Sequence, residues 1–123
     1  MKATQEDMML IRKMLELPFV IKVLDADMKA IEGSPLRTRG PLIRRFEGLR
    51  EDARHEMRDV RHLLHARGIK IIKQTRAEDR LTADYICRGR QDRMILMWSR
   101  VKSDVEERVE EGLSAAVQPF QRT

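Results

Sequence analysis

The chain has 123 residues, of which 37% are charged and 41% hydrophobic, and its formal net charge is +5. This length suits one domain with a core of its own, and high charge with regular apolar spacing is typical of solvated helix faces rather than disorder. No apolar run reaches the ~20 residues of a membrane-spanning helix, no secretion signal opens the chain, and the single cysteine excludes an internal disulfide, so the sequence predicts a cytoplasmic protein without membrane contact.

The first predicted element is a helix over residues 4–32. Thr4 and Asp7 have the spacing of a capping box, in which a hydroxyl and a carboxylate bind free amides of the first turn. Apolar residues then cover a wide arc, so we expect this helix to be central, either between the other two helices or in a homodimer. Pro18 lies within it and lacks an amide donor, so the helix is expected to kink or restart there.

The second predicted helix covers residues 41–67, because Gly40 and Pro41 open it and Gly68 ends it. Apolar residues recur every three or four positions along one face. Arginines follow the flank of that face at the same spacing, at Arg50, Arg54, Arg58 and Arg61.

A β-hairpin is predicted over residues 69–88, with a loop at residues 76–80. Side chains alternate in character from residue 81 onwards, which places Cys87 on the same apolar face as Leu81 and Tyr85. An isolated two-stranded ribbon is only marginally stable in water. The hairpin must therefore pack on a helix or pair across a subunit interface.

The third predicted helix covers residues 92–116, and residues 118–123 form a tail. Apolar residues recur at helical spacing along it: Met94, Trp98, Val101, Val105, Val109 and Leu113. The apolar run 94–98 fits either a helix or a third strand, and the helix is favoured because the spacing continues well beyond the run. The predicted fold class is α+β and mostly helical, with a β-hairpin between the second and third helices, which we expect to pack nearly antiparallel.

Basic residues are concentrated in the middle of the chain. Residues 37–67 carry nine Lys or Arg against five Asp or Glu, residues 68–103 carry nine against four, and residues 104–123 carry two against five. Such asymmetry suits an anionic partner, or pairing between the acidic end and the basic middle of the same or a second chain. The candidate contacts with nucleic acid or another partner are Arg50, Arg54, Arg58, Arg61, Arg76 and Arg80.

Two observations weaken the nucleic-acid interpretation. Glu47, Glu51, Asp52, Glu56 and Asp59 are interleaved with the arginines, and each pair at such spacing contributes about 0.2–0.5 kcal/mol while reducing the positive field. A basic helix followed by a hairpin is the outline of a winged-helix DNA reader, but a helix of this length exceeds typical domain helices.

A metal site is a further hypothesis for the second helix. His55, Asp59 and His62 share a face, and imidazole and carboxylate groups at such offsets ligate zinc. The face is expected to be solvent-exposed and no second ligand cluster completes a site, unless two copies contribute. The sequence contains no catalytic motif and nominates no catalytic residue and no cofactor.

The predicted function is therefore a non-enzymatic protein-interaction or regulatory module, expected to be a homodimer. Trp98 and the methionine-rich faces would supply the buried anchors. The alternative is a nucleic-acid-binding regulator that uses the basic helix 41–67 and the hairpin loop 76–80.

Overall fold

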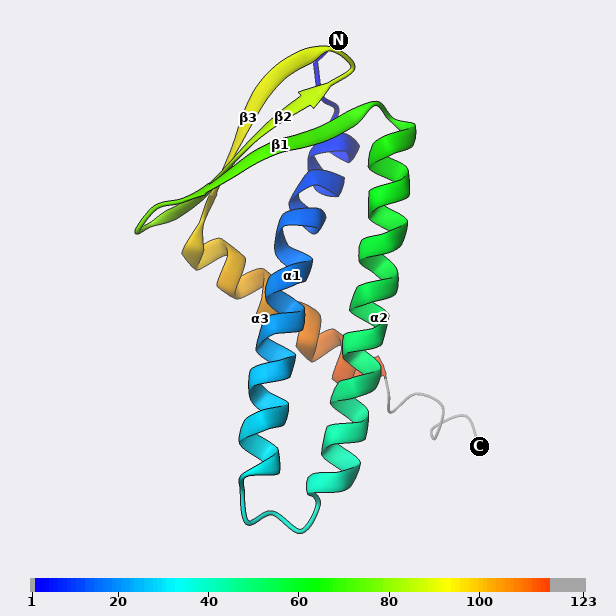
Figure 1. Ribbon diagram of the computed structural model, residues 1–123, viewed down its shortest axis with the longest axis vertical. Coiled ribbons are helices and arrows are strands. Elements are labelled where there is room, and N and C mark those ends of the chain that lie inside the picture. Colours follow the sequence, from blue (N-terminus) through cyan, green and yellow to red (C-terminus); the bar gives the residue numbers. More distant parts are fainter. Residues whose placement is uncertain (1, 116–123) are drawn as a thin grey trace.

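The computed structural model describes residues 2–115. The elements follow the order α1 (Gln5–Glu32), α2 (Arg39–Ala66), β1 (Ile69–Arg76), β2 (Arg80–Cys87), β3 (Arg90–Met97) and α3 (Trp98–Ala115), as Figure 1 shows. The strands form one antiparallel sheet in the order β1-β2-β3. This confirms the predicted α+β class, in which helices dominate and the strands lie between the second and third helices.

Helix α1 begins where the capping box predicts. The backbone amide of Asp7 donates to Thr4 Oγ1 at 3.1 Å, and the backbone amide of Thr4 donates to Asp7 Oδ2 at 2.9 Å. The helix then runs without interruption through Pro18 to Glu32, so it does not restart at the proline. Its buried residues are the centre of the core: Ile11, Leu15, Leu17, Val20, Leu24 and Met28.

Helix α1 packs against both other helices, but the antiparallel pair is α1 and α2 rather than α2 and α3. The connection over residues 33–38 is short, and short connections make consecutive helices antiparallel neighbours. Helix α3 instead crosses α1 obliquely (Figure 1). It reaches α2 near Gly112, where a side chain would collide with Leu49: a Cβ there would lie 2.7 Å from Leu49 Cδ2.

The sheet has a third strand where the sequence analysis favours a helix. Residues 92–97 belong to β3, and helix α3 begins only at Trp98. Met94 and Leu96 are buried and lie opposite Ala83 and Leu81 of β2. The alternation is short, so the ladder with β2, which precedes β3 across the two-residue turn 88–89, decides the conformation of this run.

The remaining boundaries differ little from the predicted ones. Helix α2 begins at Arg39, so Pro41 is still in the first turn, where its missing amide costs nothing. Gly68 adopts a φ of 71° and joins α2 to β1. The tail 118–123 and the last predicted helical residue, 116, lie outside the described residues. Within residues 2–115, no helix has the length and apolar character needed to cross a bilayer.

Candidate functional site

An apolar groove with a volume of about 830 Å³ lies between α1 and α3. Helix α1 contributes the half-buried Phe19 and the exposed Val23. Helix α3 contributes one apolar residue per turn along its length. Its apolar lining from α3 is Trp98, Val101, Val105, Val109 and Leu113. The stripe that the sequence assigns to a packing face of the third helix therefore lines a groove.

The groove is open to solvent at its edges and closed at its floor. Val101 and Val105 are buried, whereas the side chain of Val23 is 40% exposed and that of Leu113 is 38% exposed. Contiguous apolar surface of this kind costs solvation free energy unless a partner covers it. The groove therefore has the character of a binding surface.

Trp98 is fixed at one end of the groove by three contacts. Its indole Nε1 donates to the carbonyl of Ala77 at 2.8 Å, and its backbone amide donates to the carbonyl of Asp79 at 3.1 Å. Its ring meets the ring of Phe19 edge to face, with centroids 5.6 Å apart and an interplanar angle of 79°. A half-buried tryptophan held in one orientation is the kind of residue that dominates binding energy at interfaces.

The rim of the groove is mostly acidic. Asp27 of α1 and Glu106 and Glu110 of α3 line it together with one cation, Lys102, and all four are exposed. None of the three carboxylates takes part in an ion pair with another described residue. The rim therefore presents uncompensated negative charge around an apolar floor.

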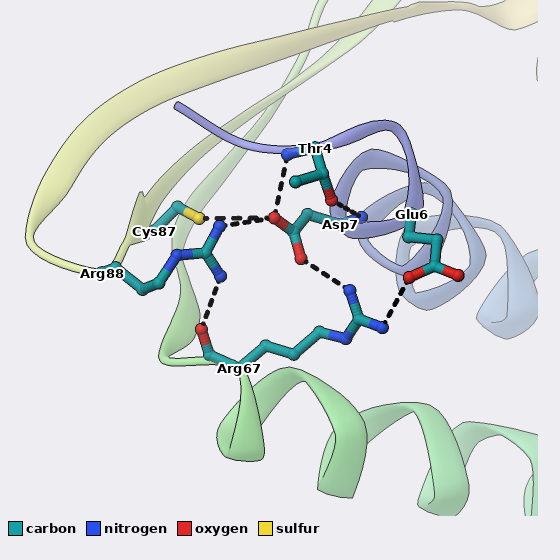
Figure 2. A network of polar contacts seen from close by, with 6 residues as sticks. All are labelled: Thr4, Glu6, Asp7, Arg67, Cys87 and Arg88. Carbon is teal, nitrogen blue, oxygen red and sulfur yellow. Dashed lines mark hydrogen bonds and ion pairs between the residues drawn. The ribbon is translucent and has the colours of Figure 1, made fainter. Parts of the chain in front are cut away.

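A second polar cluster ties the ends of α1 and α2 to the turn after β2 (Figure 2). The Asp7 carboxylate is 1% exposed and accepts hydrogen bonds from Arg88 Nη2 at 2.6 Å and from Arg67 Nη1 at 3.0 Å. Arg67 also donates to Glu6 Oε2 at 2.8 Å, and Arg88 donates to the carbonyl of Arg67 at 2.9 Å. Cys87 is buried beside this cluster, as the strand alternation predicts.

The electrostatics of Asp7 identify this cluster as structural. Hydrogen bonds from Arg88 and from the Thr4 amide hold the pKa of Asp7 well below its usual range, and burial only partly opposes them. Both of its oxygens accept hydrogen bonds from residues of the same chain. We call Asp7, Arg67 and Arg88 the Asp7 clamp, which joins three segments of the chain.

Most of the predicted arginine contacts have partners within the chain. Arg50 donates to Asp25 Oδ1 at 2.7 Å, Arg54 pairs with Glu51 at 3.6 Å, and Arg80 is bound by the adjacent Asp79. Arg76 lies over the Phe19 ring, 5.3 Å from its centroid.

Two arginines of the predicted set differ from these four. Arg58 and Arg61 are exposed on α2 and form no ion pair with another described residue. Four of the six candidate residues are thus engaged within the chain, and these two are not.

The histidine hypothesis concerns the same exposed face of α2. His55, Asp59 and His62 all lie on the surface, and His55 Nε2 is 3.5 Å from Glu51. Within residues 2–115, no group of three or more His, Cys, Asp or Glu side chains is arranged to hold a metal ion. The structure therefore adds no ligands to those that the sequence suggests.

Comparison with known proteins adds no activity to what the fold and the groove indicate. Among curated proteins and among solved structures, none is significantly similar to this chain. One family does match, and its description names no activity. Because residues 2–116 match that family, described as YhjD protein, the chain belongs to the YhjD family.

Proposed function

We propose that the protein is a non-enzymatic interaction module whose groove between α1 and α3 binds an amphipathic helix with a basic flank. The single observation that carries this proposal is the partly exposed apolar groove that ends on the fixed Trp98.

The shape of the groove favours a helix. It follows α3 from Trp98 to Ser114, which corresponds to about 24 Å at the rise of an α-helix. A partner helix of about four turns matches this length and would place its apolar residues at three- and four-residue spacing against the stripe. The free edges of the sheet, which could add a strand, do not border the groove.

The charge of the rim favours a basic partner. Lysines or arginines beside the partner's apolar stripe would lie close to Asp27, Glu106 and Glu110. Complementary rim charges raise the association rate and exclude partners of like charge. The proposal therefore predicts selectivity as well as binding.

A second copy of the chain is a less suitable occupant of this groove. A symmetric dimer brings the same surface of each copy together, so Glu106 and Glu110 of both copies would approach each other. We propose instead that the homodimer predicted from the sequence forms through the outer face of the sheet, where Ile95 and Met97 are exposed.

Two further parts of the sequence prediction remain proposals. The cytoplasmic setting rests on the single cysteine, which leaves no pair for a disulfide. The nucleic-acid alternative now rests mainly on Arg58 and Arg61, and it predicts steeply salt-dependent binding of a DNA duplex that is lost when both are changed to glutamate.

Titration with two designed peptides tests the proposal. Both are 16-residue amphipathic helices with the same leucine stripe, flanked by lysines in one and by glutamates in the other. Trp98 is the only tryptophan of the chain and lies in the groove, so its fluorescence reports occupancy directly. We expect saturable binding of the lysine peptide and at least tenfold weaker binding of the glutamate peptide.

Matched variants locate the binding. Val23→Gln combined with Leu113→Gln removes exposed apolar contacts while keeping good helix formers, and should weaken binding of the lysine peptide about tenfold. Leu63→Gln removes an exposed leucine of α2 outside the groove and should leave binding unchanged. Equal loss in both variants, or no binding of either peptide, would contradict the proposal.

A further inference from the structure

Glu16 is a carboxyl group in the interior. Its side chain is 3% exposed, and its neighbours Leu15 and Leu17 are buried. The guanidinium Nε of Arg12 lies 4.0 Å from Oε1, beyond hydrogen-bonding distance. Among the described residues, no donor reaches Oε2. A buried carboxylate oxygen without a donor is costly, whereas a protonated one can itself donate.

The group that can receive this proton is Asp104 of α3. Across the α1–α3 contact, a protonated Glu16 carboxyl can donate to the Asp104 carboxylate, and Arg100 Nε lies 3.1 Å from Asp104 Oδ1. The two carboxyl groups line a polar cavity of about 490 Å³. The other charged groups around it are Arg12 and Lys13 of α1, Glu56 of α2, and Glu107, Arg108 and Glu111 of α3.

Helix α3 is also attached to the helical hairpin by contacts other than the carboxyl pair, including the packing of Trp98 on Phe19. Val101 and Val105 are its buried residues. Arg108 Nη1 lies 2.8 Å from Glu56, and the carbonyl of Gly112 accepts a hydrogen bond from Arg45. The carboxyl pair lies between these apolar and polar contacts, so its protonation bears directly on the docking of the helix.

We propose that Glu16 and Asp104 form a proton-operated latch that keeps α3 docked on α1 while the pair holds one proton. Loss of that proton leaves two negative charges in contact in a poorly solvated place, and α3 loosens from α1. Because α3 is one wall of the apolar groove, loosening would also weaken the binding of a helix there. Only this last consequence rests on the proposed function.

The pH range of the latch follows from the surroundings of the pair. Burial, followed by the hydrogen bond to Asp104 and its charge, raises the pKa of Glu16 to about 8, although Arg12 and Arg108 oppose the shift. Burial would raise the pKa of Asp104 as well, but its hydrogen bonds with Glu16 and Arg100 lower it instead. The shared proton should therefore be held below about pH 8 and lost above it.

Valine methyl resonances of the full chain without any peptide test the latch between pH 6 and 9.5. In the wild type, Val101 and Val105 should move towards random-coil positions with a midpoint near pH 8. Glu16→Gln keeps a donor for Asp104 and has no proton to lose, so both resonances should stay constant. Glu111→Gln changes another carboxyl of the same cavity and should keep the wild-type midpoint.

Asp104→Asn provides a second measurement if Glu16→Gln does not fold. It removes one of the two negative charges and supplies an amide donor to Glu16, so the movement of both resonances near pH 8 should be lost. Constant resonances in the wild type, or the same transition in Glu16→Gln, would overturn the latch. A local titration without movement towards random-coil positions would also overturn it. None of these results depends on whether the groove binds a helix, so the latch and the proposed function can fail separately.

Discussion

Replacing Asp7 by alanine is expected to lower the free energy of unfolding by about 3 kcal/mol, the largest loss that we expect from a single polar residue here. The change removes the anion that Arg67 and Arg88 share and the carboxylate that accepts from the Thr4 amide in the capping box of α1. Arg88 would then lose its carboxylate partner, and Arg67 would keep only the exposed Glu6. Chemical denaturation monitored by circular dichroism measures the difference.

The matched control for this change is Glu6→Ala. Glu6 contacts the same Arg67 at 2.8 Å, but its side chain is 75% exposed, so the loss should stay below about 1 kcal/mol. Equal losses of unfolding free energy for Asp7→Ala and Glu6→Ala would show that burial of the Asp7 clamp does not add to the stability of the protein.

The contribution of Asp7 to the free energy of unfolding should decrease as the pH falls. Its pKa in the folded protein lies below the ordinary value of 3.8, so its stabilisation is complete above that pH and is lost as the pH falls. The difference between the wild type and Asp7→Asn should therefore be full at pH 6 and shrink below about pH 4. A constant difference across this range would contradict the charge-based account.

Reversing the charge of the groove rim should reverse the choice of partner. Glu106→Lys combined with Glu110→Lys places two cations beside the apolar stripe. We expect at least about tenfold weaker binding of the lysine peptide, or about 1.4 kcal/mol, and improved binding of the glutamate peptide. Fluorescence titration of Trp98 at low and at high salt measures both, and salt should reduce the difference.

A control variant with the same change in net charge distinguishes the effect of the rim charges on peptide binding from the effect of the protein's net charge. Glu107→Lys combined with Glu111→Lys alters the other side of α3, which faces the polar cavity. This variant should bind the lysine peptide nearly as the wild type does. If both double variants lose binding equally, the attraction comes from net charge and not from the rim.

The sequence predicts the local elements well where the signals are local. The capping box at Thr4 and the glycine at residue 68 place helix ends within about two residues. The run 94–97 is assigned to the wrong element because its apolar spacing fits a helix as well as a strand, and the hairpin pairing with β2 decides between them. The predicted antiparallel packing of the second and third helices is also wrong, because α2 packs along α1 and α3 crosses α1 obliquely.

The candidate site is only partly predictable for a related reason. The apolar stripe of α3 and the anchor Trp98 are visible in the sequence, but periodicity does not distinguish a covered stripe from an open groove. Glu16 carried a signal that the sequence analysis did not use, since it is a carboxylate inside an apolar run from residue 14 to residue 20. Its partner Asp104 and the partners of Asp7 are distant in sequence, so only the folded arrangement reveals them.

The most direct test of the proposed function is to map the peptide on the protein by NMR. Titration of the lysine peptide into isotope-labelled protein below pH 7 should perturb the methyl resonances of Val23, Val105 and Leu113. The resonances of Arg58 and Ile95, which lie on other faces, should stay in place. Perturbations confined to α2 or to the outer face of the sheet, or none at all, would contradict the assignment of the groove as the binding surface.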